Sequence, residues 1–206
     1  MILVGQSWGA VLGVNVIKRR PALFYAFVGT GLPVSVAETI EDRAHWARRE
    51  AKATGDQASI KALDDAAPLP PDKRLGALAS VSKKWILSPS DLKFKDEVLG
   101  EYADASSTKA EVVAWRAGAT FSGSTIGRAN DNFDLRRLGL DMPIPFFVVQ
   151  GREDRIAGFD STRAYVEDVR APAKAFIPID GGHYACFTDA TEFIAALNEY
   201  VRPFAT

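Results

Sequence analysis

Uninterrupted apolar runs alternate with amphipathic stretches at the start of the chain. Residues 1–4 are all apolar, which is typical of a strand that is buried on both faces. Residues 10–17 are mainly apolar, and the basic residues 18–20 followed by Pro21 are signals for the end of a helix. Because residues 23–28 form another apolar run, the opening predicts a βαβ unit with a right-handed crossover.

The same alternation returns in the last third of the chain. Residues 144–150 are rich in β-forming side chains and predict a strand. A helix is predicted over 161–169 and a further strand over 175–179. Apolar residues then recur at helical spacing over 193–201. The predicted apolar face of this last helix consists of Phe193, Ile194, Leu197, Tyr200 and Val201.

The middle of the chain, residues 34–140, has a different character. It is rich in alanine and in charged residues, and no strand-like run stands out in it. We predict helices at about 38–53, 57–66, 71–87, 108–118 and 131–138. The sequence therefore predicts an α/β protein whose parallel sheet is built from residues 1–33 and 141–206, with a helical insertion between them.

Composition and charge narrow the class of partners. Hydrophobic residues make up 47% and charged residues 25% of the chain, as in an ordinary soluble globular protein. The formal net charge of −1 gives no electrostatic reason to expect nucleic acid or an anionic membrane as a partner. No apolar run approaches the roughly 20 residues that a membrane-spanning helix needs. Since Cys186 is the single cysteine, no intrachain disulfide can form, and we expect a reducing, cytoplasmic setting.

Candidate chemistry begins at the first predicted turn. The segment from Gly5 to Gly9 reads Gly-Gln-Ser-Trp-Gly and fits the pattern G-x-S-x-G between a strand and a helix. A sharp turn there would strain the backbone at Ser7 and project its hydroxyl above the sheet, while both glycines would keep β-carbons out of crowded positions. The start of a helix favours developing negative charge, so the Trp8 N–H is expected to be one donor of an oxyanion hole. The alternative is a glycine-rich turn with an incidental serine.

A serine nucleophile needs a base at neutral pH, and the chain has two histidines. His45 lies in a charged helical stretch, where a solvated surface histidine is expected. His183 follows a predicted strand and two glycines, at the carboxyl edge of the sheet where catalytic groups gather. We therefore predict His183 as the base, and the alternative is a loop histidine that caps local carbonyl groups.

The base in turn needs a carboxylate that holds its tautomer and stabilises the imidazolium. Asp154 directly follows the predicted strand at 144–150, so its place at the sheet edge matches those of Ser7 and His183. We predict Asp154 as the acid. The alternatives are the neighbouring Glu153 and, as weaker candidates, Asp180, which is close in sequence to the base, and Asp160, which is expected to cap a helix.

These segments resemble a known superfamily. The elbow, the Gly-Arg-Glu-Asp segment at 151–154 and the Gly-Gly-His segment at 181–183 resemble the α/β-hydrolases in their Ser…Asp…His chain order. The tryptophan in the elbow and the long insertion are most similar to the prolyl aminopeptidase branch. The resemblance implies the C-terminal half of an α/β-hydrolase parallel sheet, with helices on both faces and residues 34–140 as a cap that sets substrate choice. It also implies a serine hydrolase that needs no cofactor and cleaves a small ester or an N-terminal peptide or amide bond, on a small-molecule or short-peptide substrate, through an acyl-enzyme.

The sequence departs from this family ahead of the elbow. In this branch a His-Gly-x-Pro-Gly loop and several strands come first, and that loop supplies the second oxyanion donor. No such segment precedes Ser7. We expect residues 2–4 to form an unpaired apolar edge that is completed by an N-terminal segment or by a second copy of the chain. The alternative function is a truncated, non-catalytic hydrolase fragment or one half of a split assembly.

The residues that contact the substrate are not determined by the sequence. Aromatic side chains available as pocket walls are Trp8, Trp46, Trp85, Trp115 and Phe121. An aminopeptidase also needs cap carboxylates that pair with the free amine of its substrate, and those available are Glu38, Glu41, Glu101 and Glu111. No metal site is expected, because two distant histidines without a carboxylate–histidine cluster make no ligand set.

Overall fold

The computed structural model describes residues 1–94, 108–122, 124–125 and 132–205. In these residues four strands form one sheet, in which neighbouring strands are parallel and the spatial order follows the chain. The strands are β1 (Ile2–Gln6), β2 (Ala26–Thr30), β3 (Phe146–Gly151) and β4 (Lys174–Ile179). β1 and β4 are therefore the two edges of the described sheet.

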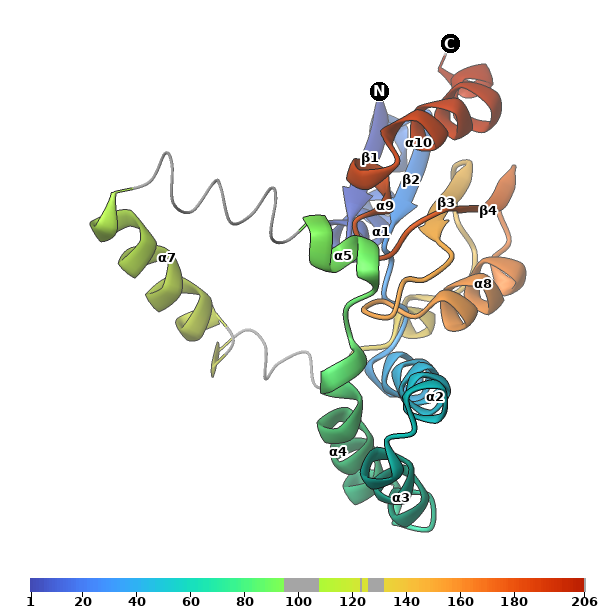
Figure 1. Ribbon diagram of the computed structural model, residues 1–206. Coiled ribbons are helices and arrows are strands. Elements are labelled where there is room, and N and C mark those ends of the chain that lie inside the picture. The colour runs from blue at the N-terminus through green and yellow to red at the C-terminus, as the bar shows by residue number, and fades with distance from the viewer. Residues whose placement is uncertain (95–107, 123, 126–131, 206) are drawn as a thin grey trace.

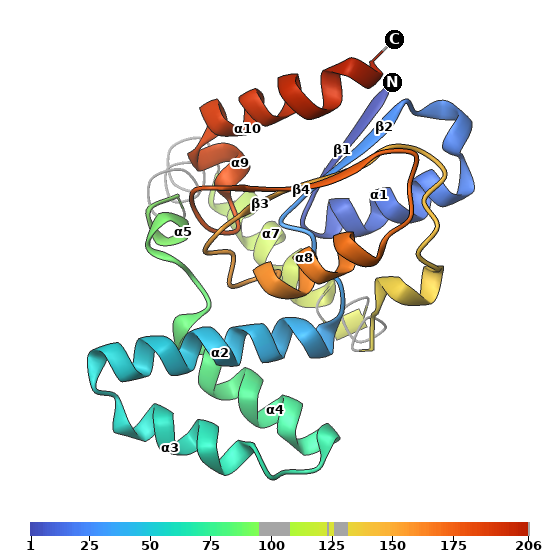
Figure 2. The ribbon, with the colours of Figure 1, turned by 90° about the vertical axis from the view of Figure 1, so that its right-hand side faces the viewer.

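Helices cover both faces of this sheet (Figure 2). One face is covered by α1 (Trp8–Arg19) and α8 (Phe159–Asp168). The other face is covered by α9 (Ala185–Thr188) and α10 (Ala190–Ala196). This layering confirms the predicted fold class, an α/β protein with a parallel sheet between two helical layers.

Alternate residues of the two central strands face two separate cores. Phe27, Phe146 and Val148 lie in the core shared with α1 and α8, where Tyr165 is also fully buried. Because both faces of these strands are buried, no polar residue is needed at alternate positions, which accounts for their uninterrupted apolar sequences. The residues that point into the second core are Ala26, Val28, Phe147 and Val149.

The first three helices of the middle region pack on one another. They are α2 (Val36–Thr54), α3 (Gln57–Ala66) and α4 (Pro71–Ser82). Together they bury a small core of Ala44, Ala47, Leu63, Ala66 and Leu78. Next come α5 (Pro89–Phe94), beside α9, and α7 (Lys109–Ser122), which stands apart from the sheet in Figure 1. The division into a core of 1–33 and 141–206 and a cap of 34–140 stays a prediction.

Two predicted elements differ at their boundaries. The second strand was expected from Leu23, but Pro21–Leu23 closes a 3-10 turn and β2 starts only at Ala26. Pro21 has a fixed φ and no N–H, so it favours the first position of a helical turn over a paired strand. The helix predicted over 71–87 likewise divides into α4 and a 3-10 turn at Lys83–Trp85.

The helix predicted over 131–138 is wrong over its described part. Residue 131 lies outside the described residues, and the chain from 132 is irregular until a single 3-10 turn at Leu135–Leu138. The Asp134 side chain accepts a hydrogen bond from the N–H of Arg136 at 2.9 Å. A short polar side chain bonded to nearby backbone in this way competes with helix formation and begins a turn instead.

The last helix has a narrower apolar face than the sequence predicted. Phe193, Leu197 and Val201 pack on the second core, but Ile194 is 55% exposed. Adjacent helical residues are about 100° apart, so Ile194 cannot share the face of Phe193 fully. After α10 the chain continues as a π-helical turn at Leu197–Val201 and a 3-10 turn at Arg202–Phe204. None of the described helices combines the length and the apolar character that crossing a bilayer requires.

Candidate active site

Ser7 lies at the sharp turn between β1 and α1. Its φ of 54° makes it the one non-glycine residue with a positive φ in the described part of the chain. This conformation is strained for a residue with a β-carbon, and such strain concentrates at functional sites. The Ser7 N–H donates to the carbonyl of Thr30 at the end of β2, at 2.9 Å. The turn therefore has the geometry expected of a nucleophile elbow.

The two glycines of this elbow have different surroundings. A β-carbon on Gly5 would lie 2.5 Å from the carbonyl oxygen of Gly9 and 2.7 Å from Cα of Ala10. A β-carbon on Gly9 would meet nothing within 4 Å. The expectation that both glycines relieve crowding is right for Gly5, where the strand and the helix approach closely, and wrong for Gly9.

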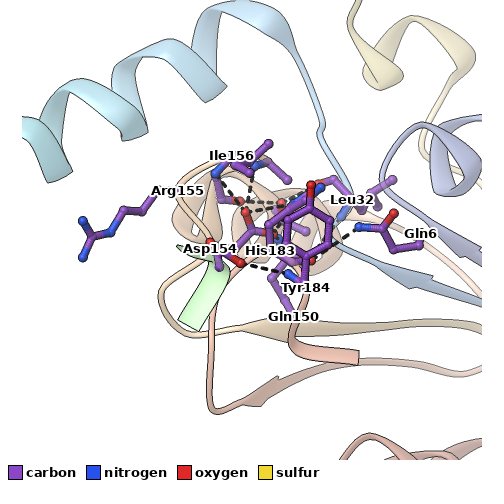
Figure 3. A network of polar contacts seen from close by, with 12 residues as sticks. Gln6, Leu32, Gln150, Asp154, Arg155, Ile156, His183 and Tyr184 are labelled. Atoms are coloured by element: carbon purple, nitrogen blue, oxygen red, sulfur yellow. Dashed lines mark hydrogen bonds and ion pairs between the residues drawn. The ribbon is translucent and has the colours of Figure 1, made fainter. Parts of the chain in front are cut away.

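Asp154 lies in the turn after β3 and is fully buried. Its Oδ1 accepts hydrogen bonds from the N–H groups of Ile156 at 3.0 Å and Ala157 at 2.9 Å. Its Oδ2 accepts from Nε2 of Gln150 at 2.8 Å. Nδ1 of His183 lies 3.1 Å from both carboxylate oxygens, and Figure 3 shows the two side chains against each other. The carboxylate is thus surrounded by donors that fix its orientation.

Gln150 determines the direction of these hydrogen bonds. Its Oε1 accepts from the N–H of Leu32 at 3.2 Å, and a backbone N–H can only donate, so the Nε2 group must face Asp154. With donors on its other sides, Asp154 accepts from an Nδ1–H of His183. That tautomer leaves Nε2 of the ring free to accept a proton.

The imidazole of His183 is held tightly, and His183 is only 4% exposed. Gly31, with a φ of +54°, lies against the ring, and a β-carbon there would be 2.9 Å from Cε1. The carbonyl of His183 accepts a hydrogen bond from Nε2 of Gln6 at 3.4 Å. The last residue of β1 and the residue that follows β2 therefore both help to place the candidate base.

The alternative site residues lie elsewhere. His45 is exposed on α2. The N-cap of α8 is Gly158, so the expectation that Asp160 caps this helix is wrong. Of the four acidic candidates, Asp154 is the one that contacts His183. The other three are paired with arginines, and of these Glu153 is half-buried while Asp180 and Asp160 are exposed.

Ser7 and His183 line the same cavity, which has a volume of about 250 Å³. This is below the usual range for drug-sized ligands, about 300–1,000 Å³, and suits a small substrate. Among the described lining residues, Arg43 is the one with a permanent charge, and no carboxylate is present. The apolar part of the wall is formed by Trp8, Pro33, Val36, Ile40, Ala79, Phe133, Ile156 and Ala157.

Helix α2 contacts the turn that carries Asp154. Nε of Arg43 donates to the carbonyl of Arg155 at 3.2 Å, and Nη2 donates to the carbonyl of Ile156. Burial lowers the pKa of Arg43, and the nearby Asp154 carboxylate partly opposes that shift. This contact was missed at the sequence level, because the two segments are about a hundred residues apart and no local pattern links them.

The short helix α5 contacts the loop that carries His183. Asp91 is fully buried and accepts from the N–H of Tyr184 at 3.1 Å and from the Ser88 hydroxyl at 2.8 Å. A β-carbon on Gly182 would collide with Ser88 and Asp91. Burial, followed by the Asp91 charge, raises the pKa of the Tyr184 hydroxyl. The spacing of Ser88 and Asp91 fits a capping pattern that could have indicated this turn from the sequence.

The predicted aromatic walls are only partly found. Trp8 lines the cavity, and its ring packs on that of Phe133 at a centroid distance of 5.3 Å. The sequence did not indicate Phe133 as a wall residue. Trp46 instead stacks with the guanidinium groups of Arg49 and Arg155. Trp85 and Phe121 do not line this cavity. The side chain of Trp115 lies outside the described residues.

No candidate carboxylate for a substrate amine lines the described cavity. Glu38 and Glu41 are paired with arginines at 2.5 and 2.8 Å. Glu111 caps its own helix, and Glu101 lies outside the described residues. Within the described chain, no group of three or more His, Cys, Asp or Glu side chains is placed to hold a metal ion.

Comparison with known proteins places the fold. No protein-family model matches the chain, and no curated protein matches its sequence. Among solved structures, VinJ matches with a TM-score of 0.56 and 17% identity over 99% of this chain and 66% of that one. An α/β-hydrolase enzyme from a Medee basin deep-sea metagenome library matches with a TM-score of 0.54 and 16% identity over 95% and 62%. Proline iminopeptidase of Mycobacterium smegmatis matches with a TM-score of 0.56 and 17% identity over 98% and 65%.

The chain therefore spans just under two thirds of the length of these proteins, 62% to 66%. Identity of 16% to 17% shows a common fold and leaves the reaction open. The parallel sheet, the strained serine turn and the layered helices agree with that likeness. The resemblance seen in the sequence is thus confirmed at the level of architecture: the chain has the α/β-hydrolase fold.

Proposed function

We propose that the chain is a serine hydrolase that cleaves a small ester or amide bond through an acyl-enzyme. One observation carries the proposal: the strained Ser7 and the His183–Asp154 pair open onto a single small cavity. A nucleophile, a base and a group that orients the base are the parts that this chemistry needs.

In the proposed reaction, Oγ of Ser7 attacks the carbonyl carbon of the substrate while its proton passes to Nε2 of His183. The tetrahedral intermediate collapses, the bond to the leaving alcohol or amine breaks, and the imidazolium gives that group its proton. Water then attacks the acyl-enzyme and passes a proton to His183, and the acid leaves as the Ser7 hydroxyl forms again. Asp154 orients the ring and stabilises its positive charge.

The Trp8 N–H supports the proposal as one donor for the oxyanion. It begins α1, and it has no hydrogen-bond partner within the described residues, whereas the N–H groups of Ala10 and Val11 donate to the Ser7 carbonyl. Free N–H groups at a helix start favour negative charge. Loss of one such donor typically costs about 10²- to 10³-fold in kcat.

The second candidate is a non-catalytic hydrolase fragment or half of a split assembly. The observation that favours it is the edge position of β1, which pairs with β2 alone in the described sheet. We propose that a preceding segment or a second copy of the chain completes this edge. In this second candidate, the chain gains hydrolase activity only when the edge is completed.

Labelling with a fluorophosphonate probe separates the two candidates. We expect the wild-type chain to react, with the added mass on the peptide that contains Ser7, and Ser7→Ala to remain unlabelled. Ser124→Ala, which removes an exposed serine hydroxyl, is the matched control and should label as the wild type does. Labelling that survives Ser7→Ala, or no labelling of a chain that circular dichroism shows to be folded, would contradict the proposed function.

A further inference from the structure

We infer that Arg43 makes the active-site cavity selective for a substrate that carries a carboxylate group in addition to the bond that is cleaved. The inference rests on the proposed function, because it names the substrate class of the same site. It differs from the aminopeptidase reading, in which the cavity would have to bind a free amine.

The guanidinium of Arg43 is fixed on one side and open on the other. Its Nε and Nη2 groups donate to the carbonyls of Arg155 and Ile156, which sets the plane of the group. Nη1 makes no hydrogen bond or ion pair within the described residues. It is also not one of the described polar atoms that are buried without a hydrogen-bond partner. It is therefore accessible to solvent, at a residue that lines the cavity. A fixed guanidinium presents its free N–H groups as a planar fork that matches a carboxylate.

Arg43 forms no ion pair with a described carboxylate, and the Asp154 charge only partly opposes the effect of its burial. The Asp154 carboxylate, whose charge acts on Arg43, has its oxygens occupied by His183, by Gln150 and by two backbone N–H groups. Glu38, on the same helix as Arg43, is paired with Arg136. A half-buried cation without a contacting anion costs free energy. A ligand that carries an anionic group would therefore bind favourably to the guanidinium of Arg43.

The other polar groups of the wall do not compete for this role. The Ser35 hydroxyl donates to the carboxylate of Glu38 at 2.9 Å, and the Thr39 hydroxyl donates to the carbonyl of Ala157 at 3.1 Å. Arg43 thus remains the charged donor that faces the cavity, while a substrate ammonium group would find a like charge and no carboxylate among the described wall residues.

The test compares two esters that differ in one charge. The substrates are the para-nitrophenyl monoester of adipic acid and its neutral methyl ester, and the readout is the ratio of their kcat/KM values. We expect the wild type to favour the acid, and Arg43→Gln to lower the ratio by about 10- to 100-fold, as for loss of a charge-assisted hydrogen bond. Arg43→Lys should keep an intermediate ratio. Arg49→Gln, which removes an exposed cation from the same helix, should keep the wild-type ratio.

An unchanged ratio of the two kcat/KM values in Arg43→Gln, even if both values fall, would overturn the inference. Arg43 would then be a residue that positions the turn that carries Asp154. Binding of monomethyl adipate to Ser7→Ala, measured by calorimetry with and without Arg43→Gln, does not depend on catalysis. Arg43-dependent binding in a chain that the probe fails to label would uphold the anion site and reject the hydrolase. Cleavage of both esters without preference, and binding that is insensitive to Arg43, would reject the anion site and uphold the hydrolase.

Discussion

Gly31 and Gly55 both have a positive φ but very different neighbours. Their φ values are +54° and +71°. A β-carbon on Gly31 would lie 2.9 Å from Cε1 of His183, whereas one on Gly55, at the end of α2, would meet nothing within 4 Å. The two glycines therefore allow the cost of backbone strain to be separated from the effect of displacing the candidate base.

Gly31→Ala is expected to lower kcat by about 10- to 100-fold, because misplacing a catalytic group by about 1 Å can cost that much. Gly55→Ala should lose a comparable stability, about 1–2 kcal/mol from the left-handed backbone, and keep its kcat. Thermal unfolding and steady-state kinetics on the neutral ester measure the two effects. Similar losses of activity in both variants would show that strain, and not contact with the imidazole, explains the effect.

At the scale of elements, one face of α2 contacts the turn that carries Asp154. Its Thr39 donates to the carbonyl of Ala157, and its Glu50 accepts from Nη2 of Arg155 at 3.0 Å. The guanidinium of Arg155, which points away from Asp154 in Figure 3, lies 4.6 Å from the centroid of the Trp46 ring. Helix α2 therefore stabilises the turn of the candidate acid and also forms part of the wall of the cavity.

Asp42, on the same helix, contacts the start of α8 and makes the stability of the fold depend on pH. Burial raises the pKa of Asp42, although the N–H of Ser161 donates to it at 3.0 Å. A folded-state pKa above the unfolded value contributes stability that is fully present below the unfolded pKa and is lost as the pH rises through the folded pKa. Asp42→Asn is neutral at every pH, so its Tm relative to the wild type should rise as the pH increases above about 4, the pKa of an unfolded aspartate.

The control for this prediction is Asp168→Asn, which changes an exposed carboxylate on α8. Its Tm difference from the wild type should stay nearly constant over the same pH range. A constant difference for Asp42→Asn as well would show that burial of the Asp42 charge does not affect folding.

For the whole molecule, β1 is one of the two open edges of the described sheet. Val4 on this strand is 49% exposed, and Leu12 on the adjoining α1 is 64% exposed. An unpaired apolar strand edge offers its backbone N–H and carbonyl groups to another strand. The sheet is thus poised to pair with further chain.

We expect the wild-type chain to self-associate as its concentration rises, and Val4→Lys to reduce that association, because a charge on an edge strand opposes edge-to-edge pairing. Sedimentation velocity over a concentration series measures the effect. Val113→Lys, which changes an equally apolar and 66% exposed residue on α7, is the control and should associate as the wild type does. A wild type that stays monomeric throughout would contradict this expectation.

Most of the fold could be predicted because its strands and helices follow local patterns of apolar and polar residues. The apolar runs of β1, β3 and β4 and the amphipathic stretches of α2 and α3 are close to their predicted bounds. The failures occur where a local side-chain effect overrides the pattern, as when Pro21 delays β2 and Asp134 begins a turn. The short α5 was not predicted, since six residues carry too little periodicity.

The sequence by itself determined most of the elements, including the Gly-Gln-Ser-Trp-Gly turn, because these depend on neighbours within a few positions. The tertiary structure decided which carboxylate faces His183, that Gly31 lies against its ring, and that Arg43 from a distant helix lines the cavity. These contacts join residues that are about thirty to a hundred and fifty positions apart. Packing sets their geometry, and no local periodicity records which distant side chains will meet.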